Sequence, residues 1–87
     1  MTEFTLSRAT IRNATGWRYH RVRTLIESAY RLDCRRDPAG PKGGGHTERF
    51  RLGDVLARCR AQRNYNEDIM TAKLIAADAA YRKENNR

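Results

Sequence analysis

One segment limits what this chain can fold into more than any other: RDPAGPKGGGHT, residues 36–47. It holds two prolines and four glycines, so neither a regular helix nor a buried core can be built from it. The segment is either a flexible loop or the tip of a long hairpin, and the residues on its two sides favour the hairpin.

The flanking segments alternate as short strands do. In ERFRL, which follows the loop, Phe50 and Leu52 fall on one face, as expected of a return strand. In RLDCR, which precedes it, Leu32 and Cys34 would face inward in a strand, although this segment could also be the extended end of a helix. The predicted wing, strands and loop together, spans about residues 33–49.

Two helices are predicted before this wing. The first lies within TLSRATIRNATG, residues 5–16, with Ser7 as N-cap, Leu6 as a hydrophobic staple and Gly16 ending or turning it. The second continues to about Tyr30. Its apolar residues recur at helical spacing and form one inward stripe: Val22, Leu25, Ile26 and Ala29.

The other face of the second helix is polar and largely cationic. His20, Thr24 and Glu27 lie opposite the apolar stripe, and Arg21 and Arg23 flank them. Arg18 is placed in the first turn, where free backbone N–H groups favour phosphate.

Two helices are also predicted after the wing. The first is capped by Asp54 and buries three residues: Val55, Leu56 and Cys59. The last begins after Asn66 as N-cap and carries an apolar stripe: Met70, Leu74, Ala77 and Tyr81, with Ile69 beside it.

We expect the stripe on the last helix to pair two copies of the chain, because its small alanines allow close helix approach. The alternative is that this face covers the chain's own core. The predicted architecture is mainly α with a small β-hairpin: a head at residues 1–63 followed by a dimerisation helix at residues 64–87.

The charge is large and unevenly placed. A net charge of +8 and a pI of about 10.3 are typical of proteins that bind a polyanion, either nucleic acid or an anionic membrane surface. Residues 1–36 carry +5 and residues 48–66 carry +3, whereas the remaining segments are neutral. Most of the cations are arginine, which suits phosphate and guanine edges, although high genomic GC content would give the same bias.

Several classes of protein are disfavoured. The sequence has neither the charge pattern of a signal peptide nor an apolar stretch of membrane-spanning length, so we expect a cytoplasmic protein without a membrane partner. Cys34 and Cys59 do not form a disulfide framework, and they lack the paired spacing of a zinc site. No catalytic constellation is found, so we expect no enzyme activity, cofactor or metal.

The order helix, turn, basic helix, strand, loop, strand, helix matches a winged helix-turn-helix, whose second helix enters the major groove of DNA. The segment IRNATGWRYHRVRTLI, the triple glycine before Phe50, DVLARC and AKLIAADAAYRKE together resemble the winged-helix heads of the MerR and excisionase superfamily. Within it they look most like the DNA-binding domain of lambdoid phage terminase small subunits. Arg18 and Tyr19 depart from that family, which usually starts this helix with Ser or Thr.

The resemblance implies a dimer that recognises a packaging site on double-stranded phage DNA and passes it to a large terminase subunit with ATPase and nuclease activity. Two rivals stay open. A MerR-like or excisionase-like regulator would use the same head at a promoter or an attachment site. A basic protein-interaction module would bind an acidic partner instead of DNA.

The predicted DNA contacts fall into two groups. On the second helix, His20 and Thr24 are best placed for base edges, with Arg21 next, whereas Arg18 and Arg23 would hold phosphate. Tyr19 would either contact DNA or pack at the turn, and we expect Trp17 in the core. In the wing, the predicted contacts are Lys42 and His46 near the tip, unless the loop makes none, and four arginines at its base: Arg35, Arg36, Arg49 and Arg51.

Overall fold

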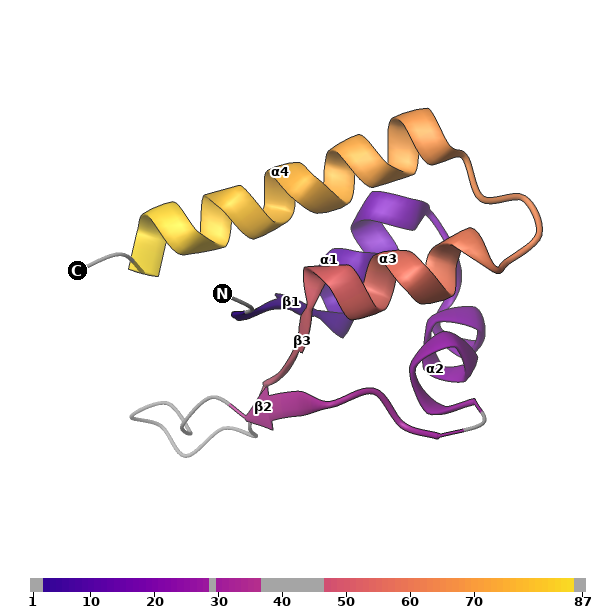
Figure 1. Cartoon of the computed structure of the whole chain (residues 1–87), viewed down its shortest axis with the longest axis horizontal. Coiled ribbons are helices and arrows are strands. Elements are labelled where there is room, and N and C mark those ends of the chain that lie inside the picture. The colour runs from indigo at the N-terminus through magenta and orange to yellow at the C-terminus, as the bar shows by residue number, and fades with distance from the viewer. Residues whose placement is uncertain (1–2, 29, 37–46, 86–87) are drawn as a thin grey trace.

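The computed structural model describes residues 3–28, 30–36 and 47–85. In this part of the chain, four helices and three short strands follow one another (Figure 1): β1 (Phe4–Ser7), α1 (Arg8–Thr15), α2 (Tyr19–Glu27), β2 (Cys34–Arg36), β3 (Glu48–Arg51), α3 (Leu52–Arg60) and α4 (Glu67–Asn85). The mainly helical class is therefore confirmed, with a small antiparallel sheet.

Two residues identified from the sequence set the ends of α1. The Ser7 hydroxyl accepts a hydrogen bond from the backbone N–H of Thr10 at 3.1 Å, so it is the N-cap. At the other end, Gly16 has a φ of 72° and its N–H donates to the Arg12 carbonyl at 2.7 Å. This left-handed conformation favours glycine, which lets the chain turn at once into α2.

The second helix is shorter than predicted. It ends at Glu27 rather than near Tyr30, and Arg18 is its N-cap residue rather than part of its first turn. The inward stripe is confirmed for Val22, Leu25 and Ile26, all of which are buried. Ala29 lies outside the described residues.

A strand that the sequence did not reveal turns the predicted hairpin into a three-stranded sheet. The strand order is β1-β3-β2, with both pairs antiparallel. Leu6 lies opposite Phe50 on one edge of β3, and Cys34 lies opposite the same residue on the other edge. Leu6 is thus a buried strand residue rather than a staple, because its partner comes from a distant part of the chain.

β3 runs into α3 without a loop. Leu52 is the first helical residue, not a strand residue, and Arg51 stands at the N-cap. The prediction that Asp54 caps this helix is wrong, since Asp54 lies in the first turn, where its charge still favours the helix N-terminus. The buried face of α3 is as predicted: Val55, Leu56 and Cys59.

α4 packs along the rest of the chain. Asn66 caps it as predicted, since its side-chain oxygen accepts the N–H of Ile69 at 3.0 Å. Leu74 is fully buried in the common core. The buried carboxylate of Asp78 accepts a hydrogen bond from the Thr5 hydroxyl of β1 at 2.5 Å. The core therefore closes only with α4 in place over α1 and β1.

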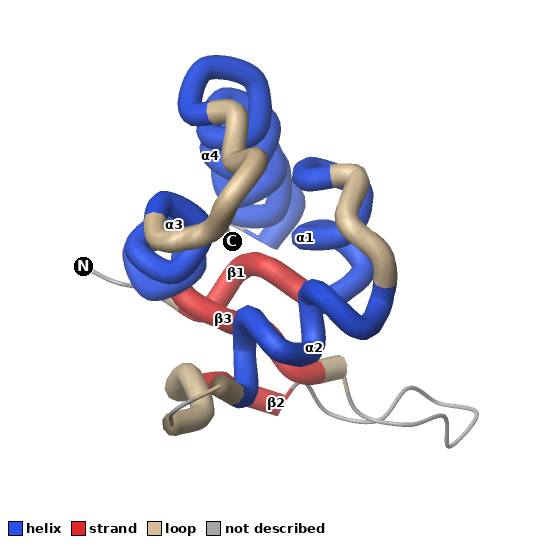
Figure 2. Tube along the Cα trace, turned by 90° about the vertical axis from the view of Figure 1, so that its right-hand side faces the viewer, coloured by secondary structure: helices blue, strands red, loops and turns tan. Residues whose placement is uncertain are grey.

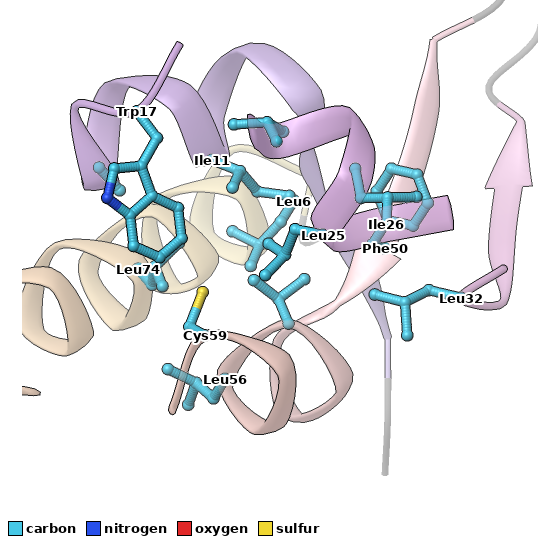
Figure 3. Close-up of a cluster of buried hydrophobic side chains, with 13 residues drawn as sticks. Leu6, Ile11, Trp17, Leu25, Ile26, Leu32, Phe50, Leu56, Cys59 and Leu74 are labelled. Carbon is cyan, nitrogen blue, oxygen red and sulfur yellow. The ribbon is translucent and has the colours of Figure 1, made fainter. Parts of the chain in front are cut away.

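The elements lie at three levels (Figures 1 and 2). α4 lies along the top, α1, α3, β1 and β3 occupy the middle, and α2 and β2 lie at the bottom. One cluster of buried side chains joins α4, α3, α1 and α2, including Leu74, Cys59, Ile11 and Leu25 (Figure 3). Because Val22, Leu25 and Ile26 point into this cluster, the opposite surface of α2 faces away from it.

Candidate nucleic-acid interface

The outward side of α2 is polar and accessible. Most of the residues predicted to contact DNA on this helix are exposed: Arg18, Tyr19, His20, Arg23 and Thr24. Part of this surface is a shallow hollow lined by His20, Arg23, Thr24, Glu27 and Ser28. Trp17 is buried at the turn, as expected. The surface thus combines cations with neutral hydrogen-bonding groups that could reach base edges.

Arg21 is the exception among these residues. Its guanidinium carbon lies 4.0 Å from the centroid of the Trp17 ring, and its Nη2 donates to the backbone carbonyl of Arg63. The side chain is half-buried. Although Arg21 was predicted to be a base-edge contact, it points toward the linker between α3 and α4.

One acidic residue lies on the outward side of α2. The carboxylate of Glu27 is 3.3 Å from Arg8 of α1 and 3.6 Å from Arg23 of its own helix. These two guanidinium groups offset a negative charge that would otherwise repel phosphate at this end of α2.

β2, which lies in the same part of the fold as α2, carries two further arginines (Figures 1 and 2). It is an edge strand, and Arg35 and Arg36 are both exposed on it. Nε of Arg36 lies 3.9 Å from a carboxylate oxygen of Glu48 on β3, and the Arg36 side chain is 66% exposed. Its charge therefore stays at the surface. The predicted contacts Lys42 and His46 lie outside the described residues.

Glu48 gathers the cations at the base of the wing. It forms ion pairs with Arg8 at 3.1 Å and with Arg31, and the Cys34 thiol donates to it at 3.7 Å. Burial opposes ionisation of this carboxyl group, but the hydrogen bond from Arg8 and the charges of Arg31 and Arg8 outweigh it and hold the pKa of Glu48 below its ordinary value. An ionised Glu48 thus anchors arginines from α1, the α2–β2 connection and β2.

Arg49 and Arg51 do not extend the wing surface. Strand residues alternate between the two faces of a sheet, so the burial of Phe50 sends its two neighbours the other way. The guanidinium of Arg49 lies 4.1 Å from the centroid of the Tyr81 ring on α4. That of Arg51 lies 4.4 Å from the ring of Phe4 on β1. Both arginines therefore pack against other elements of the fold.

The stripe predicted to pair two copies of the chain is mostly occupied within one copy. Leu74 is fully buried, Met70 and Ala77 pack against the same core, and Tyr81 lies under Arg49. Leu74, Met70 and Ala77 thus cover the chain's own core, as the alternative interpretation had it, and pairing of two copies through this helix stays a prediction. Ile69 differs, since it is 55% exposed on the outer side of α4.

Sequence reasoning did not single out three residues that lie at or near this surface. Tyr30 is 75% exposed just after α2, and Arg31 reaches Glu48 at the wing base. Arg63 is exposed on the α3–α4 linker, which the Arg21 hydrogen bond joins to α2. A large aromatic residue directly after a basic helix could have identified Tyr30. Nothing local could have identified Arg63, because its place depends on how the linker folds back.

One of the two cysteines is enclosed in the core. Burial raises the pKa of the Cys59 thiol to about 11, so it is neutral and enclosed. No group of three or more His, Cys, Asp or Glu side chains among residues 3–28, 30–36 and 47–85 is arranged to hold a metal ion. Within the same ranges, no helix has the length and apolar character needed to cross a bilayer.

Comparison with known proteins assigns no family. No family model matches the chain, and neither a curated protein nor a solved structure matches it.

Proposed function

We propose that the chain is a sequence-specific double-stranded DNA-binding protein of the winged helix-turn-helix type. In this proposal α1, the turn at Gly16 and α2 form the helix-turn-helix, and α2 enters the major groove. β2 and β3 form the wing, which lies along the adjacent backbone.

One observation carries the proposal: α2, whose outward side chains are exposed, and the edge strand β2, with two exposed arginines, both lie in the part of the fold away from α4 (Figures 1 and 2). A duplex approaching this part of the fold would meet α2 first and β2 beside it. His20 and Thr24 would read base edges, whereas Arg18, Arg23, Arg35 and Arg36 would hold phosphates.

We further propose that this protein acts as the DNA-recognition part of a phage terminase small subunit, as a homodimer that reads two half-sites. The resemblance in sequence supports this role, and a large terminase subunit would then be a partner. A regulator with the same head would bind beside a promoter or an attachment site instead. Selecting bound fragments from a phage genome distinguishes the two, because a packaging site and a promoter lie in different places.

The electrostatic part of the proposal gives a measurable slope. Four phosphate contacts per head would make the logarithm of the binding constant fall with the logarithm of salt concentration with a slope of about −3.6, so a fourfold rise in salt would weaken binding about 150-fold. Fluorescence anisotropy with a random duplex measures this slope. Absence of any binding at low salt would overturn the proposal and favour a module for acidic protein partners.

Paired variants separate the two kinds of contact. Arg35→Ala should weaken random and selected duplexes alike and reduce the size of the slope by about 0.9. Thr24→Ala should weaken the selected duplex by roughly 5-fold or more and leave the random one almost unchanged. Lys83→Ala on α4 is the matched control, because it removes one exposed charge on the opposite side and should alter neither value.

A further inference from the structure

Two arginines join α2 to other parts of the fold, one at each end of the helix. Arg21 lies near the N-terminal end, where its guanidinium stacks on the Trp17 ring and donates a hydrogen bond to the Arg63 carbonyl. Arg58, which comes from α3, reaches the C-terminal end. The sequence suggested a DNA contact for the first and no role for the second.

The Arg21 contact joins α2 to the linker between α3 and α4. Trp17 belongs to the buried core, and its ring lies 6.2 Å from that of Tyr65. The linker reverses at Asn64, which has a φ of 61°, a left-handed conformation that is uncommon outside glycine. The Arg63 carbonyl next to this turn thereby accepts the Arg21 hydrogen bond. Contact of Arg21 with DNA would require it to leave both the ring and this carbonyl.

The Arg58 contact completes the other end of α2. A helix leaves its last carbonyls without partners inside the helix, and α2 has no basic residue in its last turn and no left-handed cap. Nη1 of Arg58 donates to the carbonyls of Leu25 and Ile26 at 2.7 and 3.2 Å, and Nη2 donates to that of Tyr30 at 2.5 Å. The positive charge also suits the negative end of the helix dipole.

We infer that Arg21 and Arg58 are positioning residues, which hold α2 at the angle that its outward side chains need for reading base edges, and that neither contacts DNA. This inference rests on the proposed function and names how its site is kept in place. Base recognition depends on the orientation of the helix, whereas phosphate attraction tolerates small changes. Loss of either arginine should therefore reduce selectivity and leave the salt dependence unchanged.

Arg23→Met is the matched control for Arg21→Met, because both change one arginine of α2 and only Arg23 is exposed. Arg21→Met should lower the ratio of affinities for selected and random duplexes on the order of tenfold, with the salt slope unchanged. It should also shift the fluorescence emission of Trp17, the single tryptophan of the chain. Arg23→Met should reduce the size of the slope by about 0.9 and leave the emission unchanged.

Arg21→Lys gives a second test of the positioning role, because it keeps the positive charge at residue 21. Lysine can still hold a phosphate but cannot stack its charge as a plane on Trp17, so this variant should behave like Arg21→Met. Arg58→Met should reduce selectivity in the same way, with Arg60→Met, on the exposed side of α3, as its control. The inference is overturned if Arg21→Met reduces the slope without moving the emission, or if Arg21→Lys restores full selectivity.

Failure of the proposed function has a different signature. If the wild-type chain binds no DNA, the emission of Trp17 in free Arg21→Met still reports whether Arg21 holds the linker. An emission identical to that of the wild type would overturn the positioning role as well.

Discussion

Replacing Leu74 by alanine tests whether α4 is part of the folded head or a separate appendage for pairing. Leu74 is fully buried among residues from the other helices, so its removal leaves a cavity in the common core. Leu→Ala changes at such sites cost about 2–5 kcal/mol, and we expect about 3 kcal/mol here. A domain of this size has roughly 4–13 kcal/mol of stability in total, so the loss is a large fraction. The melting temperature should fall by roughly 12–24 °C.

The assay is urea unfolding followed by circular dichroism, with Ile75→Ala as the matched control. Ile75 is the next residue along α4 and is 48% exposed, so its truncation should cost well under 1 kcal/mol in the monomer. If Leu74→Ala cost less than about 0.5 kcal/mol, the packing of α4 on the core described here would be refuted. Repeating the Ile75→Ala measurement at several protein concentrations tests pairing: a cost that grows with concentration would show that the outer face of α4 is buried between copies.

Three further outcomes follow from single groups in the structure. The pKa of Glu48 is held below its ordinary value, so its ion pairs stabilise the protein above the pKa of a free glutamate and are lost as the pH falls through the lowered value. Glu48→Gln should therefore flatten the acid limb of a melting-temperature profile, and an unchanged limb would contradict the role of Glu48. The Cys59 thiol, with its pKa raised to about 11 by burial, should react with a thiol reagent only as fast as the protein unfolds, whereas labelling faster than unfolding would show that it is open to solvent. Gly16→Ala should cost about 1 kcal/mol in chemical unfolding, because alanine is strained at a φ of 72° while its Cβ would meet no atom within 4 Å; a neutral result would mean that this turn can relax.

Features set by neighbouring residues could be predicted from the sequence. Ser7 and Asn66 act on N–H groups three residues further along the chain, so their capping roles follow from local order alone. The glycine that ends α1 and the buried stripes of α2 and α3 could be predicted for the same reason, because each depends on residues close together in the sequence. Helical periodicity also identified the apolar stripe of α4, which we expected to pair two copies and which packs mostly on the chain's own core.

Features set by distant contacts could not be predicted. β1 has only four residues, and no turn-forming residues in the sequence mark it as a strand. It forms a strand because it pairs with β3, which lies far away in the sequence. The end of α2 likewise depends on Arg58, which lies on another helix. Alternation along β3 could have shown that Arg49 and Arg51 point away from the side of Phe50. Their partners, Tyr81 and Phe4, became visible only with the fold.

The difference between local and distant contacts also explains why the number of arginines in the sequence overstates the number available to contact DNA. Five arginines lie over aromatic rings within the described residues, and all but Arg21 have a partner from a distant part of the chain: Arg8, Arg21, Arg49, Arg51 and Arg58. Their long apolar stems and planar charges supplement a small core, which lysine would do less well. The preference for arginine over lysine in this chain therefore has a structural source besides DNA binding or genomic composition. Only the arginines whose charge stays at the surface of α2 and β2 should contribute to the salt dependence of DNA binding. The slope therefore counts the arginines that reach phosphate, as distinct from those that pack inside the fold.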